Sequence, residues 1–185
     1  MNKNDTLNSL LILLAEGDQA AFRKIYYMYY DRLFRFAIHL IKDEMSSEEI
    51  VSDVLLNIWL SREKMTDVTD FNAFLYKSVK NQALHYIDKT NRRIKCEDLS
   101  VDIEYIADDS DPENLMLYDE LNRKLKEAIE SLPEKCRIIF KLAREDGLPY
   151  IKIADILGIS VKTIDAQMAI AKQKIEQIVK RYLNG

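Results

Sequence analysis

The sequence predicts an all-α protein in which two small helical domains are joined by an acidic linker. Only 4 Gly and 3 Pro occur among the 185 residues, so long stretches lack the residues that most often break helices. Within these stretches apolar residues recur every three or four positions, which is typical of amphipathic helices. The formal charge is +1 over residues 1–95, −10 over residues 96–122 and +5 over residues 123–185, within a total of −4. We therefore expect one domain over residues 1–95, a flexible linker over residues 96–111 and a second domain over residues 112–185.

The composition is that of a globular protein of the cytoplasm. Apolar residues make up 48% of the chain, enough for a core, and charged residues make up 31%. The apolar run at residues 10–15 is too short to cross a membrane, and Glu16-Gly17-Asp18 follows it instead of a small-residue cleavage site. Cys96 and Cys136 lack metal-ligand spacing and are expected to be reduced thiols. We therefore expect neither membrane insertion nor secretion.

The first two helices are predicted from a glycine stop and an aspartate start. The first is expected over residues 6–16 and ends at Gly17, where glycine best accepts a left-handed conformation. Asp18 is expected to cap the second helix. The apolar stripe of that helix falls on positions 22, 25, 26, 29, 33, 36, 37 and 40.

Two more helices complete the first domain. Ser46 and Glu49 have the spacing of a capping box, which predicts a helix start at Ser46. Residues 62–70 are polar and are expected to form a loop, and Asp70 can cap the fourth helix. The residues expected to point inward are Ile50, Val51, Val54, Leu55, Ile58 and Trp59 in the third helix, and Phe71, Phe74, Leu75, Val79, Ala83 and Ile87 in the fourth.

The acidic block contains the chain's only alternation of apolar and polar residues. Leu99, Val101, Ile103 and Tyr105 alternate with polar side chains, which predicts an extended segment, and its acidity favours a linker over a core strand. The second domain is then expected to begin with a helix at Asp111-Pro112-Glu113. Ser131-Leu132-Pro133-Glu134 resembles a second capping box and is expected to open the next helix.

Residues 147–165 have the layout of a helix, a tight turn and a second helix. Gly158 suits the turn, and Ser160 can cap a helix that starts at Val161. The turn and the small residue Ala154 favour a helix-turn-helix that places its second helix in the DNA major groove. An ordinary helical corner is the alternative. The apolar stripes are Tyr150, Ile153, Ala154 and Leu157 in the first helix, and Ile164, Met168, Ala171, Ile175 and Ile178 in the second.

The polar face of the second helix is the predicted DNA-reading surface. Glutamine can pair with adenine, alanine can contact the thymine methyl group, and lysines such as Lys162, Lys172 and Lys174 can contact phosphates. Simple solvation of the helix is the alternative for Lys172 and Lys174. The predicted DNA-binding residues are Lys162, Thr163, Asp165, Ala166, Gln167, Ala169 and Lys172.

A second candidate nucleic-acid surface lies on the fourth helix. Cations and polar groups beside the loop at residues 64–69 suit a single strand with an unstacked base. A solvated amphipathic helix is the alternative. The residues expected on this side are Lys77, Lys80, Asn81, His85 and Lys89.

No residue pattern indicates catalysis. The two histidines, His39 and His85, fall on different predicted helices without a cysteine or carboxylate cluster. The chain also has no glycine-rich phosphate loop and no nucleophile motif. We expect a protein that is not an enzyme and has no cofactor, no metal and no small-molecule substrate.

These segments, in this order, resemble the extracytoplasmic-function (ECF) group of the sigma-70 family of transcription initiation factors. The resemblance runs from about Gly17 to Tyr182. Its parts are the opening helix with Phe22, Tyr26, Tyr30, Leu33 and Phe36, the segment from Ser46 to Trp59, the fourth helix with Phe74-Leu75-Tyr76, Asn81, His85-Tyr86 and Lys89, and Leu132-Pro133 with the helix-turn-helix.

The resemblance implies a promoter-specificity subunit with a second-domain fold of the winged-helix-like or sigma region 4 type. It implies core RNA polymerase and promoter DNA as partners, together with an inhibitory anti-sigma factor. The first domain would dock on polymerase and hold the melted downstream element, and the second would read the upstream element. The family's docking segment usually has Gln and Phe where this chain has Ser52 and Leu55. The residues expected to dock are Glu49, Ser52, Asp53, Leu56 and Asn57.

Two features are particular to this chain. Asp165 stands where the family often has Arg or another polar contact residue; a carboxylate repels phosphate, although it can accept from cytosine N4. The acidic linker could thread a basic polymerase channel as a nucleic-acid mimic, or could merely set the domain spacing. Outside the family, a stand-alone helix-turn-helix regulator that binds as a dimer is the main alternative, and an adaptor that binds only protein is another.

Overall fold

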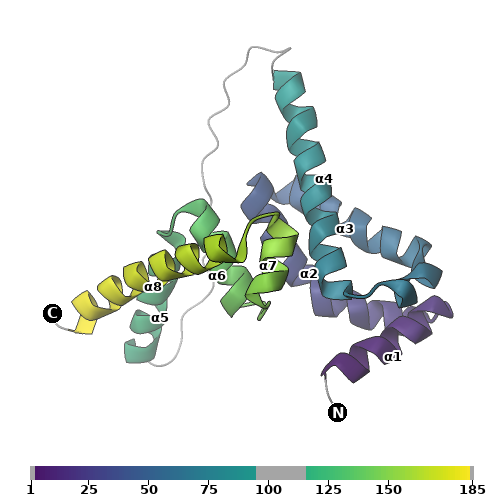
Figure 1. Ribbon diagram of the computed structural model, residues 1–185, viewed down its shortest axis with the longest axis horizontal. Coiled ribbons are helices and arrows are strands. Elements are labelled where there is room, and N and C mark those ends of the chain that lie inside the picture. Colours follow the sequence, from purple (N-terminus) through teal and green to yellow (C-terminus); the bar gives the residue numbers. More distant parts are fainter. Residues whose placement is uncertain (1–2, 95–115, 184–185) are drawn as a thin grey trace. The chain divides into compact units, whose positions relative to one another are not determined.

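The computed structural model describes residues 3–94 and 116–183, and every regular element within these ranges is helical (Figure 1). This confirms the all-α prediction. The expected linker and the expected helix start at Asp111-Pro112-Glu113 lie outside the described residues. The elements are α1 (Lys3–Ala15), α2 (Gln19–Ile41), α3 (Glu44–Leu60), the 3-10 helix η1 (Arg62–Asp67), α4 (Phe71–Ile94), α5 (Met116–Glu130), α6 (Glu134–Arg144), α7 (Tyr150–Leu157) and α8 (Val161–Leu183). They divide into two units, which are described separately. The first holds α1 to α3, η1, α4 as far as Thr90 and Ala154–Gly158 at the end of α7, and the second holds the other described residues.

The turn between α1 and α2 forms as its sequence predicts. Gly17 has a φ of +88°, a conformation that a side chain would strain. The Asp18 carboxylate then accepts hydrogen bonds from the backbone N–H groups of Ala20 and Ala21, at 2.6 and 3.1 Å. These bonds satisfy two of the N–H groups that have no partner inside the helix. Both the glycine stop and the aspartate cap are confirmed.

The start of α3 differs from the prediction. Asp43 is the N-cap, and its carboxylate accepts from the Ser46 backbone N–H at 2.7 Å. Ser46 therefore lies in the first turn, and its hydroxyl donates instead to the Tyr86 hydroxyl at 2.8 Å. The capping-box interpretation of Ser46 was wrong because an equally good cap precedes it by three residues and starts the helix earlier.

The core of the N-terminal unit lies between the apolar faces of its helices. Three residues of α3 and α4 that were expected inside are not fully buried: Phe74 is exposed, and Trp59 and Ile87 are half-buried. Residues 62–67 form η1 instead of an open loop, because Met65 is buried there and η1 packs against α1. The fully buried large side chains of this unit are Leu14, Ile25, Leu33, Leu55, Ile58, Leu75 and Tyr76.

The C-terminal unit is centred on α8, which packs against both α5 and α6. Leu132, Cys136 and Ala171 form a buried cluster against which Phe140 and Ile175 pack. Of the predicted stripe on α8, Ile164, Met168 and Ala171 are buried, whereas Ile175 and Ile178 are half-buried.

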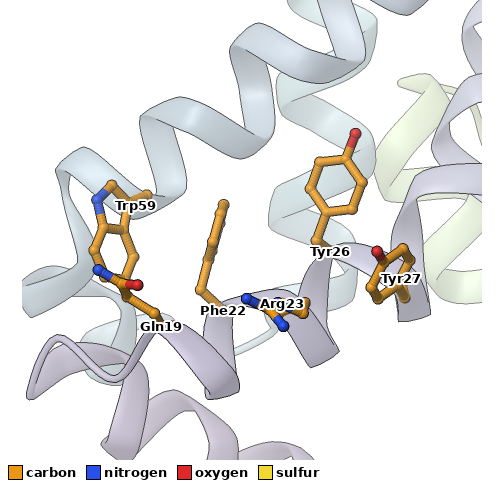
Figure 2. A pocket seen from close by; sticks show the side chains of 6 residues that line it. All are labelled: Gln19, Phe22, Arg23, Tyr26, Tyr27 and Trp59. Carbon is orange, nitrogen blue, oxygen red and sulfur yellow. The ribbon is translucent and has the colours of Figure 1, made fainter.

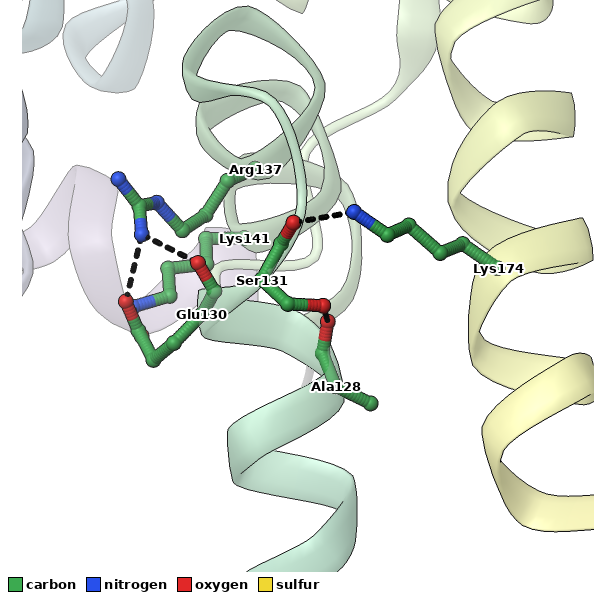
Figure 3. Close-up of polar contacts among 6 residues, drawn as sticks. All are labelled: Ala128, Glu130, Ser131, Arg137, Lys141 and Lys174. Atoms are coloured by element: carbon green, nitrogen blue, oxygen red, sulfur yellow. Dashed lines mark hydrogen bonds and ion pairs between the residues drawn. The ribbon is translucent and has the colours of Figure 1, made fainter. Parts of the chain in front are cut away.

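The turn between α5 and α6 is held by charged groups in place of the predicted capping box (Figure 3). Ser131 does not cap α6, because its hydroxyl donates to the Ala128 carbonyl at 2.8 Å. Glu130 instead accepts from Arg137 at 2.9 Å and from Lys141 at 2.6 Å. Lys174 of α8 donates to the Ser131 carbonyl. The Lys174 contact joins α8 to the α5–α6 turn, whereas the others lie within α5, α6 and the turn itself.

Candidate nucleic-acid interface

The helix-turn-helix is built by two local devices that the sequence predicts. Gly158 has a φ of +73°, and its N–H donates to the Ala154 carbonyl at 2.9 Å, which ends α7. Ser160 accepts from the Thr163 backbone N–H at 3.1 Å and starts α8. The two hydroxyl groups of Ser160 and Thr163 also lie 2.8 Å apart. The glycine turn and the serine cap are therefore confirmed.

The predicted reading residues of α8 are exposed with one exception. Lys162, Ala166 and Ala169 lie opposite the buried stripe, with Asp165 and Lys172 on one flank and Thr163 on the other. Gln167 lies next to that stripe and is half-buried, so its side chain is poorly placed for base contact. Its backbone carbonyl accepts a hydrogen bond from the Cys136 thiol at 3.2 Å. Burial raises the pKa of that thiol above its usual value. Gln173 is an exposed residue that the sequence interpretation missed, although it follows Ala166 by seven positions and therefore shares its face.

The lysines of α8 are less available to phosphate than their number implies. Lys174 turns inward to the Ser131 carbonyl, and Lys172 lies 3.8 Å from Glu176. Within the described part of the chain, Lys162 has no ion-pair partner, and it lies on the outward face near the helix start. The recognition helix thus offers one well-placed unpaired lysine, which is little charge for duplex binding.

The second predicted surface, on α4, is broader than a single face. Lys77 and Asn81 share the outward side with the exposed residues Phe74, Leu84 and Asp88, which the sequence interpretation did not include. At about 100° per residue, the step from Lys80 to Lys89 turns the helix by roughly two and a half turns, so these two lysines lie on opposite flanks. His85 is exposed on the flank nearer Lys89. The expectation that all five predicted residues lie on one side was wrong, because their spacing does not follow the helical repeat.

The predicted docking residues do share one face of α3. Glu49, Asp53, Leu56 and Asn57 are exposed, and Ser52 is half-buried, opposite the buried stripe that runs from Ile50 to Ile58. The exposed fractions are 52% for Leu56, 66% for Leu60 and 80% for Met45, so the face is both acidic and apolar. The sequence interpretation did not include Leu60 and Met45 in this face. Leu60 could have been found, because it lies one turn beyond Leu56 and is also leucine.

An open pocket of about 340 Å³ lies beside this face and was not predicted from the sequence (Figure 2). Phe22 lies between Trp59 and Tyr26, with its ring centroid 5.2 Å from that of Trp59. Burial, together with the nearby Glu48, raises the pKa of Tyr26. The four-residue spacing of Phe22, Tyr26 and Tyr30 was the available signal. The pocket is lined by Gln19, Phe22, Arg23, Tyr26, Tyr27 and Trp59.

Neither a metal site nor a membrane span is found in the part of the chain that the structure describes. Among its side chains, no group of three or more His, Cys, Asp or Glu residues is placed to hold a metal ion. Its helices include none that is long and apolar enough to cross a bilayer.

Comparison with known families and structures identifies both units. The model of sigma-70 region 2 matches residues 25–93, and the model of sigma-70 region 4 matches residues 122–175. The chain is 26% identical to the ECF RNA polymerase sigma-E factor of Escherichia coli (strain K12), over 97% of each chain. It is 27% identical to the protein of that name from Haemophilus influenzae, over 92% of this chain and 94% of that one.

Two solved structures share the fold at lower identity. One is the sigma factor RpoE in complex with the anti-sigma factor NepR from Bartonella quintana, with a TM-score of 0.64 and 23% identity over 86% of this chain and 96% of that one. The other is CnrH in complex with the cytosolic domain of CnrY, with a TM-score of 0.55 and 19% identity over 94% of this chain and 97% of that one. With both family regions matched in order and relatives aligned over nearly their whole length, the chain belongs to the ECF group of the sigma-70 family of RNA polymerase sigma factors.

Proposed function

We propose that this promoter-specificity subunit grips the promoter at two points while it is bound to core RNA polymerase. In this proposal residues 1–95 dock on polymerase and hold the melted downstream element, residues 96–111 form the linker, and residues 112–185 read the upstream element. The observation that carries the proposal is the presence of region 2 and region 4 in one chain, each with an exposed helix face of suitable chemistry.

Docking is assigned to the exposed face of α3. Glu49 and Asp53 supply carboxylates one turn apart, and Leu56 adds apolar area between them and Leu60. An apolar centre with charged neighbours is the usual composition of a protein-binding surface. Because Trp59 of α3 lines it, the aromatic pocket lies at the edge of this face.

Capture of the melted strand is assigned to the outward side of α4. Asn81 offers an amide there, and the neighbouring Phe74 offers an exposed aromatic ring. Lys77 adds a cation, which is paired with Asp155 at 2.7 Å in this structure. Single-stranded DNA is bound by this combination of charge and stacking. Lys80, His85 and Lys89, on the two flanks, would contact the backbone over a wider path.

The chain is proposed to have no catalytic activity of its own and to act with polymerase in the cytoplasm. Its relatives are sigma factors, in which nucleotide chemistry belongs to the polymerase partner. No cofactor or small-molecule substrate is assigned.

An anti-sigma factor is proposed as the inhibitory partner. The two solved structures described above are both complexes, and that of RpoE contains an anti-sigma factor. The exposed apolar residues Met45, Leu56 and Leu60 on an acidic face are a surface that a regulatory protein could cover in place of polymerase.

Equilibrium binding of the labelled full-length chain to purified core polymerase tests the docking assignment. Asp53→Lys reverses a charge on the docking face, and we expect it to weaken binding by at least about tenfold. Asp31→Lys makes the same change at an exposed site on α2 and serves as the control. Equal affinity of the two variants would contradict the assignment. Tight duplex binding by the chain alone, as a dimer and without affinity for core, would instead favour a stand-alone regulator.

A further inference from the structure

Asp165 is an exposed carboxylate on the reading side of α8. It follows the Ser160 cap by five residues and lies on the flank of the outward face, next to Lys162 and Ala169. Within the described part of the chain, it has neither a hydrogen-bond partner nor an ion-pair partner, whereas the acid further along the helix, Glu176, lies 3.8 Å from Lys172. Asp165 is therefore a negative charge that the fold itself does not neutralise.

Such a charge opposes duplex binding of any sequence. DNA carries about one negative charge per 1.7 Å of its axis, so a carboxylate in the groove is repelled wherever it finds no donor. Lys162 is the one unpaired lysine near Asp165 on the described part of α8, since Lys174 is turned inward and Lys172 is next to Glu176, so the repulsion is offset only in part. The short side chains of Ala166 and Ala169 leave room for α8 to approach the base edges closely. A carboxylate at this place is favourable only where a base offers a hydrogen to it.

The major groove offers few such hydrogens. Cytosine presents its N4 amino group as a donor, whereas guanine presents two acceptors and thymine presents an acceptor and a methyl group. Adenine has an N6 donor, but its N7 acceptor lies beside it and repels a carboxylate while it suits an amide. Cytosine is therefore the base that a lone carboxylate favours.

We propose that Asp165 selects a cytosine in the upstream promoter element and that it gains this selectivity by lowering affinity for every other base. The proposal rests on the proposed function, because it needs α8 in the major groove. It makes Asp165 a specificity-determining residue, whose main effect is to reject wrong sequences.

A promoter library with a randomised upstream element tests this. Run-off transcripts made by the full-length chain with purified core polymerase are sequenced and compared with the input. We expect the unmodified chain to prefer cytosine at one position by about tenfold. Asp165→Ala should lose that preference while it transcribes the other sequences as well or better, and Asp165→Asn should move the preference to adenine at the same position.

The controls separate the possible failures. Glu176→Gln removes a carboxylate that lies further along the same helix, next to Lys172. The cytosine preference should be unchanged in this variant. Unchanged helical circular dichroism shows that each variant is folded, as expected for an exposed site. An identical base preference in Asp165→Ala, or a uniform loss over all sequences, would overturn the proposal. A chain that directs no transcription from any library member would contradict the proposed function instead.

Discussion

At the scale of single residues, the first turn of α3 depends on the Asp43 carboxylate. Hydrogen bonds from Ser46 lower the pKa of Asp43 below its usual value of 3.8. A group whose folded-state pKa is depressed stabilises the fold above its unfolded pKa and loses that contribution as pH falls through the folded pKa. The cap therefore contributes fully at neutral pH and fades in acid below about pH 4.

We predict that Asp43→Ala lowers the free energy of unfolding at pH 7 by about 1 kcal/mol. Asn also caps helices well, so Asp43→Asn should retain most of this stability but without the acid dependence of the carboxylate. Urea unfolding of both variants at pH 7 and pH 3 measures the difference. If Asp43→Ala and Asp43→Asn unfold alike at pH 7, Asp43 is not the cap.

Tyr29 is a second residue whose ionisation is coupled to folding. Its buried hydroxyl donates to the Asn72 side chain at 2.5 Å, which joins α2 to the start of α4. Burial is the main reason that its pKa is raised from 10.0 to about 12. A raised folded-state pKa means that the stabilisation is complete below pH 10 and is lost as pH rises through about 12.

We predict that Tyr29→Phe costs about 1 kcal/mol at pH 7, because the Asn72 side chain loses a partner. The variant should also lose part of the alkaline destabilisation that we expect of the unmodified chain between pH 10 and pH 12. Tyr27 is 73% exposed, so Tyr27→Phe should change neither property. Denaturant unfolding at several pH values measures how the free energy of unfolding depends on pH. An unchanged alkaline profile in Tyr29→Phe would contradict the coupling of Tyr29 ionisation to folding.

At the scale of elements, α8 must both fill the core and present the reading face. Ile164 is fully buried one residue before Asp165. We predict that Ile164→Ala lowers the free energy of unfolding by about 2–5 kcal/mol. Ile170 is 44% exposed on the same helix, so Ile170→Ala should have a small effect and serves as the control. Chemical unfolding of the full chain checks this, and similar losses in both variants would show that the helix does not pack as described.

The elements also show which parts of the fold a sequence can predict. Helical periodicity and glycine identified the stripes of α2 and α8 and the turns at Gly17 and Gly158, because these depend on local geometry. The two capping boxes failed because other groups competed for the same positions: Asp43 precedes Ser46, and the Ser131 hydroxyl bonds to Ala128. A spacing rule cannot tell which of two possible capping groups forms the cap, since their contributions to helix stability differ by only about 1 kcal/mol.

The candidate site was predicted unevenly for the same reason. The docking residues on α3 fall on one face, as their three- and four-residue spacing requires. The α4 set does not, because its members were chosen by chemistry more than by spacing. The aromatic pocket was missed because the spacing on α2 indicates only one of its walls, whereas the contact of Trp59 on α3 with Phe22 is tertiary and no local pattern contains it.

At the scale of the whole molecule, residues 96–122 carry a net charge of −10, which sets the linker and the start of the second domain apart from the rest of the chain. We predict that neutralising Asp108, Asp109, Asp111 and Glu113 together impairs initiation but leaves binding to core polymerase intact, since a channel that holds nucleic acid is expected to be basic. Abortive-product synthesis and core binding are measured side by side. Unchanged abortive synthesis would show that the linker only sets the spacing of the domains.

The low charge of the recognition helix α8 is also understood at the scale of the whole molecule. With one well-placed unpaired lysine in its described part, α8 cannot bind duplex DNA strongly by itself. Affinity must then come from the polymerase that the other unit engages, because two linked contacts reinforce each other. Because α8 alone binds duplex DNA weakly, we infer that the chain needs the second contact through polymerase.

Run-off transcription by purified core polymerase, with and without this chain, tests the two-point grip most directly. The account predicts a promoter-dependent transcript only when the full chain is present, and loss of that transcript when either Asp53→Lys or Lys162→Glu is introduced. A transcript that survives both changes, or a chain that shifts promoter duplex without polymerase and never supports transcription, would contradict it.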